Sequence, residues 1–277
     1  MVAWRMTSQQ RDGATLVALG VLAAAAATVL HEALGHGGAC WLSGGHNLVI
    51  SSVNEDCTVA NPWISAAGTL VNLAAGCVFF LWARRVRRSF HLRYLLWVAM
   101  MFNWLDAAGY WLFSGAGNVG DWADILASHH PAWLWRTAMS IGGAAAYVFF
   151  VWLGVRELRP LLPSALAERV RRARYLMLVP YFTFGAMACI AGVFNPVGAV
   201  LIAESAAAAS FGGASGLAWG WQFTKGPYFA GAEGEGEGAG LRITDGRATR
   251  LGHSRAWIAA GVIVAALYIG ILGPGVR

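Results

Sequence analysis

Apolar runs of about 20 residues recur from one end of this 277-residue chain to the other. A helix of that length spans a lipid bilayer and pairs its backbone polar groups within its own segment. Only 12% of the residues are charged, against about 25% in soluble domains. We therefore predict an all-α transmembrane bundle of about six or seven spans, forming one integral membrane domain over residues 1–277. The predicted spans are 14–34, 62–83, 94–114, 137–155, 175–193, 197–219 and 256–273.

The sixth predicted span contains Glu204 and many glycine, alanine and serine residues. We expect this span to be broken or re-entrant, and its small residues allow close helix packing in lipid. A carboxylate within a membrane is a functional candidate by default. Glu204 is therefore expected to face an active-site cavity, relay protons or pair with arginine, and the alternative is a buried, hydrogen-bonded or interfacial glutamate.

Arginines gather in two loops between predicted spans, at 84–93 and 168–174. Cytoplasmic loops of membrane proteins carry such an excess, so we place both loops and the N-terminus in the cytoplasm. The loop between the first two spans then lies outside, and it holds Glu55 and Asp56 without lysine or arginine. Topology thus explains the net charge of +6, and we expect no nucleic-acid partner. The expected location is a bacterial inner membrane, with lipid as a partner.

The first span ends in His31-Glu32-Ala33-Leu34-Gly35-His36. Two imidazoles beside a carboxylate hold a metal and activate its water in hydrolases, where the usual motif is H-E-x-x-H on one helix face. Here the second histidine comes one residue later. Residues four apart in an α-helix lie about 40° apart around the axis, and residues five apart lie about 140° apart. A regular α-helix would therefore separate His31 from His36.

Two local features would bring these imidazoles together. A π-bulge adds one residue to a helical turn and restores a common face. Alternatively, the helix ends near Gly35, and Gly37 and Gly38 let the backbone turn His36 inward. A third interpretation gives these residues no metal: His31 and Glu32 are interfacial groups, and His36 lies in the following loop.

A catalytic zinc takes about three protein ligands and keeps one position for water. The end of the third span lies on the same side of the membrane as the end of the first, so a third ligand is expected there. Asp121 follows a glycine-rich segment that would let it approach a buried site, and Asp106 within the span is its competitor. A helix N-cap is the alternative role for Asp121.

The order of these segments resembles the site-2 protease family of intramembrane zinc metalloproteases. Residues 31–36 are similar to the family's His-Glu-x-x-His helix, and 66–72 (Ala-Ala-Gly-Thr-Leu-Val-Asn) to its Gly-Pro-x-x-Asn segment. Residues 102–103 (Phe-Asn) and 120–122 (Gly-Asp-Trp) look like the halves of its third segment. The resemblance covers roughly residues 15–130. It departs from the family in the extra residue between the histidines, in Thr69 where the family has proline, and in the missing proline-rich stretch before Asp121.

The resemblance implies that His31, His36 and Asp121 are the ligands of a Zn²⁺ ion. It also implies that Glu32 is the general base and that Asn72 is a catalytic polar group near the scissile carbonyl. A metalloprotease-like core would then occupy residues 13–130, and residues 131–277 would add further transmembrane helices.

We therefore predict an intramembrane zinc metalloprotease that hydrolyses a transmembrane or membrane-adjacent peptide with a metal-activated water. One alternative is a membrane metal-binding protein without protease activity, because imidazole and carboxylate also suit other divalent ions. The other is a channel or transporter with these polar groups along its pathway. The absence of an internal repeat argues against the transporter.

The remaining predictions concern the cysteines and one loop. Cys40 and Cys57 bracket the first outer loop, where they form either a disulfide or two structural thiols. Residues 231–240 alternate glycine with glutamate and have no apolar face, which predicts a flexible loop.

Overall fold

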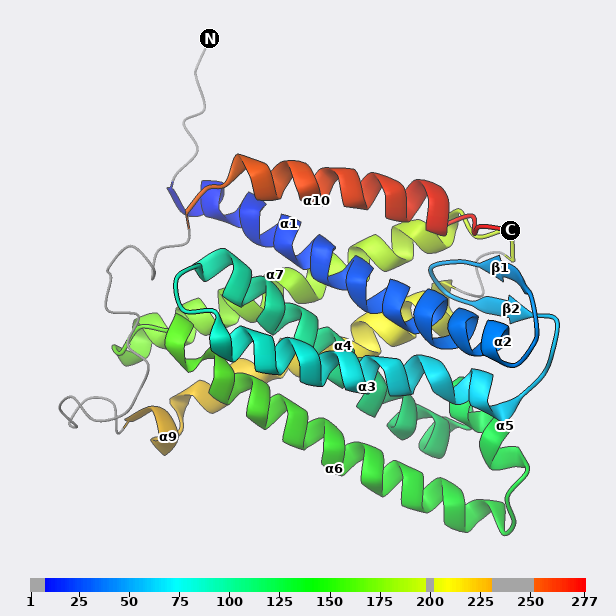
Figure 1. Cartoon of the computed structure of the whole chain (residues 1–277). Helices are drawn as coiled ribbons and strands as arrows, with labels where there is room; N and C mark the ends of the chain where they lie inside the picture. Colours follow the sequence, from blue (N-terminus) through cyan, green and yellow to red (C-terminus); the bar gives the residue numbers. More distant parts are fainter. Residues whose placement is uncertain (1–7, 198–201, 231–251) are drawn as a thin grey trace.

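The computed structural model describes residues 8–197, 202–230 and 252–277, and its helices run alongside one another as a bundle (Figure 1). Within these residues, five helices are long and apolar enough to cross a membrane. The chain is thus helical and compatible with a multi-pass membrane protein. The five helices are Gly13–Leu42, Pro62–Arg85, Ala132–Leu161, Leu166–Val193 and Arg255–Leu272. The predicted flexible loop at 231–240 lies outside the described residues.

The elements are named in chain order, with η for a π-helix or a 3₁₀-helix. They are α1 (Ser8–Val29), η1 (Leu30–Gly37), α2 (Gly38–Leu42), β1 (Asn47–Ile50), β2 (Glu55–Cys57), α3 (Pro62–Arg85), α4 (Phe90–Gly117), α5 (Asp121–Ala127), α6 (Ala132–Leu158), η2 (Arg159–Leu161), α7 (Leu166–Val193), η3 (Ile202–Gly212), η4 (Gly213–Ser215), α8 (Gly216–Trp219), η5 (Gly220–Lys225), α9 (Pro227–Ala230), α10 (Arg255–Leu267) and η7 (Tyr268–Leu272).

Two of the seven predicted spans are not among these five apolar helices. The third, at 94–114, falls on α4, whose aromatic and polar residues include Asp106 and which is buried along most of its length. The sixth, at 197–219, runs as the π-helix η3, the 3₁₀-helix η4 and the short helix α8 in direct succession, with residues 198–201 outside the described part. The helix type changes twice, but residues 202–219 stay helical, so the predicted break or re-entrant turn is not seen among them.

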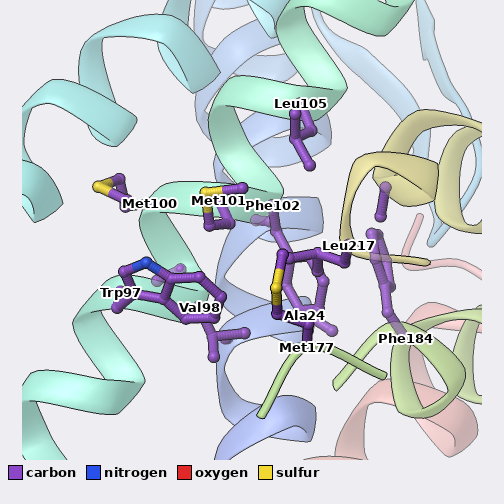
Figure 2. Close-up of a cluster of buried hydrophobic side chains, with 14 of the residues drawn as sticks. Ala24, Trp97, Val98, Met100, Met101, Phe102, Leu105, Met177, Phe184 and Leu217 are labelled. Atoms are coloured by element: carbon purple, nitrogen blue, oxygen red, sulfur yellow. The ribbon is translucent and has the colours of Figure 1, made fainter. Parts of the chain in front are cut away.

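Helix α4 forms the centre of the bundle and packs against α1, α3 and α6. Its large side chains interlock with residues of α1, α7 and α8 (Figure 2). Two aromatic side chains of this core have backbone partners, and such pairing matters because an unpaired polar group is costly in an apolar interior. The Tyr94 hydroxyl donates to the Leu176 carbonyl at 2.8 Å, and the Trp97 indole donates to the Gly154 carbonyl at 2.8 Å.

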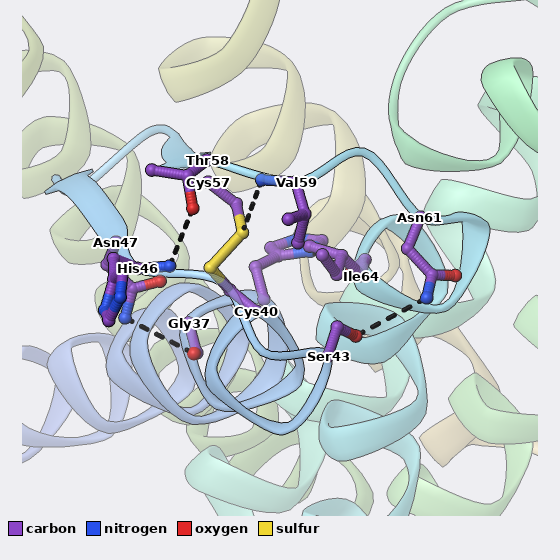
Figure 3. Close-up of a disulfide and its surroundings, with 11 residues drawn as sticks. Gly37, Cys40, Ser43, His46, Asn47, Cys57, Thr58, Val59, Asn61 and Ile64 are labelled. Atoms are coloured by element: carbon purple, nitrogen blue, oxygen red, sulfur yellow. Dashed lines mark hydrogen bonds between the residues drawn. A yellow bond between two sulfur atoms is a disulfide. The ribbon is translucent and has the colours of Figure 1, made fainter.

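A small antiparallel hairpin interrupts the helical architecture at one end of the bundle. Strands β1 and β2 pair with Ile50 opposite Glu55, and Ile50 also pairs with Val276 of the C-terminus. A disulfide joins Cys40 of α2 to Cys57 of β2 (Figure 3), so of the two predicted states for these cysteines the structure has the disulfide. The all-α prediction did not include strands β1 and β2, which form because two segments of the outer loop hydrogen-bond to each other.

At Gly35 and Gly68 the backbones of η1 and α3 touch directly. A Cβ atom on Gly35 would lie 2.5 Å from Cα of Gly68 and 2.8 Å from its nitrogen. Only glycine fits this contact without moving one of the two helices. The contact brings the first two segments of the predicted site together.

We predict that Gly35→Ala lowers the free energy of unfolding by about 1–3 kcal/mol, because the added methyl group overpacks this contact. Gly38→Ala is the matched control three residues later, since a Cβ there meets nothing within 4 Å. Thermal unfolding in detergent checks both variants. Equal stability of the two variants would contradict the backbone contact.

Candidate metal centre

The π-helix η1 places His31 and His36 on one face. A π-helix repeats at five residues rather than four, which matches the spacing of the two histidines. Their Nε2 atoms lie 3.1 Å apart, and both side chains are buried. Of the two predicted local solutions the structure has the π-helix, since the helix continues past Gly35 into α2. The interpretation of His36 as a loop residue is wrong.

Asp121 completes a triangle with the two imidazoles. Its Oδ2 atom lies 3.2 Å from Nε2 of His31 and 3.3 Å from Nε2 of His36. Asp121 is the first residue of α5, and the N-cap is Gly120 at φ +77°. The predicted N-cap role of Asp121 is therefore wrong. The left-handed glycine turns the chain so that the carboxylate faces the histidines.

The triangle fits a tetrahedral ion. Zinc bonds of about 2.0–2.1 Å place neighbouring ligand atoms about 3.3 Å apart, and the three edges measure 3.1, 3.2 and 3.3 Å. Oδ2 of Asp121 is buried and receives no well-formed hydrogen bond from the described residues. A Cβ on Gly68 would lie 2.5 Å from Nε2 of His36 and 2.7 Å from that of His31. The space beside both nitrogens therefore depends on a glycine.

Each imidazole is held from behind through Nδ1. Nδ1 of His36 donates to the Ile64 carbonyl at 2.6 Å, which leaves Nε2 free to act as a ligand. Nδ1 of His31 lies 3.4 Å from Oδ2 of Asp106. Histidine ligands in metal sites are oriented by such partners. The predicted competitor for the third position, Asp106, thus lies behind His31 and not in the triangle.

Asn72 lies in the same layer as Asp106. Its fully buried amide donates to Oδ2 of Asp106 at 2.6 Å and lies 3.2 Å from Nδ1 of His31. The sequence resemblance implied a position near the scissile carbonyl. In the structure Asn72 contacts Asp106 and His31, and its expected position near a scissile carbonyl stays a prediction.

Glu32 lines a small, partly open cavity of about 30 Å³ next to His31 and Asp106. Such a volume holds about one or two water molecules. Other walls come from the second half of the chain, through α7, η3 and η7, with Phe184, Ser205, Ser210 and Tyr268. Residues 131–277 therefore help to enclose the predicted general base. Glu204 belongs to η3, and its side chain lies outside the described part.

Two contacts were not predicted from the sequence. The ring of Tyr110 stacks on that of His31 with centroids 4.8 Å apart. The indole Nε1 of Trp122 donates to Oγ1 of Thr69 at 3.1 Å. From the sequence, neither Tyr110 nor the Trp122 side chain was assigned a role. Their only signal was their place near Asp106 and Asp121 in the chain.

Asp121 lies outside the membrane-spanning helices, and its charge state suits a ligand. Burial acts to raise the pKa of its carboxyl, but the adjacent imidazoles of His31 and His36 outweigh burial and hold that pKa below its usual range. The carboxylate is therefore ionised, which is the form that binds a metal.

Comparison with known proteins finds no match: no family model, no curated protein and no solved structure is similar to this chain.

We predict that Asn72→Leu lowers the free energy of unfolding by about 1–3 kcal/mol, because the buried Asp106 carboxylate loses its amide donor. Asn103→Leu is the matched control on α4, where a buried amide donates to a neutral carbonyl, that of Ala99, at 2.7 Å. Asn103→Leu is expected to lower the free energy of unfolding by less than Asn72→Leu does. Thermal unfolding in detergent compares the two variants. Equal losses of stability would contradict the prediction that the hydrogen bond to Asp106 contributes more than the one to the Ala99 carbonyl.

Proposed function

We propose that the protein is an intramembrane zinc metalloprotease, similar in its site to the site-2 protease family. The observation that supports this most is the triangle of His31 Nε2, His36 Nε2 and Asp121 Oδ2, whose edges suit a tetrahedral ion. A carboxylate adjacent in sequence to the first ligand and a water-sized cavity beside it add the other parts of a hydrolytic site.

His31, His36 and Asp121 would hold the zinc, which would supply a water of lowered pKa and polarise a peptide carbonyl. Glu32 would accept the proton of the attacking water as the new C–O bond forms. Glu32 would then give that proton to the leaving amine as the peptide C–N bond breaks. The cavity beside Glu32 would leave room for this water. Asn72 and Asp106 hold His31 in orientation.

We also propose the membrane placement. The N-terminus and the arginine-rich loops lie in the cytoplasm of a bacterial cell, and the hairpin lies outside its inner membrane. The Cys40–Cys57 disulfide supports this orientation, because disulfides persist in oxidising compartments. Helix α5 lies at the same end of the bundle as the hairpin (Figure 1). The metal centre then lies toward the outer side, and the proposed substrate is a transmembrane or membrane-adjacent peptide.

We predict about one zinc per chain in detergent-purified protein, and its loss in His31→Ala, His36→Ala and Asp121→Ala, because three ligands are needed. Asp124→Ala is the matched control, since this exposed carboxylate lies on the same short helix. Elemental analysis after gel filtration gives the ratio. A folded, metal-free wild type would end the protease proposal.

We predict that Glu32→Gln keeps the zinc and lowers peptide hydrolysis by about 10²–10⁴-fold, because it removes the general base alone. The assay uses single-span peptides in liposomes and detects new termini by mass spectrometry, with a zinc chelator as the second control. Zinc binding without any cleavage by the wild type would favour a metal-binding protein without protease activity.

A further inference from the structure

Helix α3 supplies none of the three proposed ligand atoms. One face of this helix nevertheless contacts the residues around the candidate metal centre. The Ile64 carbonyl accepts from His36, Gly68 leaves room for both imidazoles, and Asn72 touches Asp106 and His31. These positions recur at four-residue intervals and so share one helix face. Thr69 lies beside this face, three residues before Asn72, and its hydroxyl accepts a hydrogen bond from Trp122 of α5.

Asp121 is the one proposed ligand that no membrane-spanning helix carries. Helix α5 has seven residues, from Asp121 to Ala127, and an isolated helix of that length is not stable alone. Its link to α4 passes through two left-handed residues, Asn118 at φ 56° and Gly120 at φ 77°. The position of the carboxylate must therefore come from contacts that α5 makes with its neighbours.

The neighbouring residue, Trp122, makes such a contact. Its indole nitrogen donates to Oγ1 of Thr69 at 3.1 Å, and the Thr69 side chain is fully buried. The edge of the same indole meets the ring of Trp111 at 6.2 Å between centroids. The acceptor end of this hydrogen bond is buried, and a hydrogen bond at lower dielectric is stronger than one in water.

We propose that Thr69 is a positioning residue of the metal centre, whose hydroxyl holds Trp122 and thereby holds the Asp121 carboxylate against the two imidazoles. The inference rests on the proposed zinc site. Thr69 follows Gly68 directly, so one turn of α3 sets both the space at the histidine nitrogens and the distance to the third ligand. A proline at position 69 would have no hydroxyl to accept this bond.

The test measures zinc affinity of the full-length protein in detergent by chelator competition. Thr69→Val removes the acceptor at nearly constant volume, and Trp122→Phe removes the donor. Each is expected to weaken zinc binding by about tenfold, as loss of an outer-shell partner does. The double variant is expected to bind as weakly as either single one, because both remove the same bond. The visible absorption of bound Co²⁺ should change in both.

Thr69→Ser keeps the hydroxyl and should bind zinc like the wild type. Thr183→Val is the matched control, because among the described residues this half-buried threonine on α7 bonds only within its own helix, to the Val179 carbonyl at 2.8 Å. Wild-type affinity in Thr69→Val, or losses that add in the double variant, would overturn the proposal.

Amide hydrogen exchange supplies a readout that needs no metal. Thr69→Val should speed exchange in residues 120–127 and leave the rest of the bundle unchanged, because α5 alone loses its anchor. Should the wild type bind no zinc, the proposed function fails, and the exchange result then decides the positioning role by itself. Unchanged exchange at 120–127 would reject it.

Discussion

The backbone contact between Gly35 and Gly68 is the constraint on which the candidate site depends. Without side chains at either position, η1 and α3 approach closely enough that the imidazoles of His31 and His36 lie over Gly68. The same approach brings the Ile64 carbonyl, Thr69 and Asn72 within reach of the site. Lipid tails are as apolar as the helix faces, so the hydrophobic effect does not bring membrane helices together. Such helices associate through close packing at small residues instead. Here the small residues also leave the space that a metal ion needs.

The two buried aspartates of the candidate site, Asp106 and Asp121, lie next to polar partners. An ionisable group in an apolar interior is costly unless it is paired and hydrogen-bonded. Asp106 meets this requirement through Asn72 and His31, and Asp121 through both histidines. This explains why α4 can carry a carboxylate although most of the helix is buried. The pairing also orients the imidazoles, so the same contacts that make burial of charge tolerable prepare the site for a metal.

The two halves of the chain contribute differently to the site. The ligand triangle, its outer partners, the hairpin and the disulfide all come from residues before 130, whereas α7, η3 and η7 add walls to the cavity beside Glu32. The early segments could thus hold a metal, but the cavity of the proposed general base forms only when the later helices pack against them. Helices that looked supplementary in the sequence are part of the proposed catalytic environment.

Much of the helical architecture follows from the sequence, because apolar runs of membrane length have one stable solution in lipid. The order His31, Glu32, His36, Asp121 likewise pointed to a metal, since ligand chemistry is a property of side chains. The tertiary structure decided the rest. It selected the π-helix over a broken helix, Asp121 over Asp106 in the triangle, and a position behind His31 for Asn72. Hydropathy and local periodicity describe one segment at a time. These choices depend on how closely η1, α3 and α5 approach one another, and that distance is set by glycines and hydrogen bonds between segments far apart in the chain.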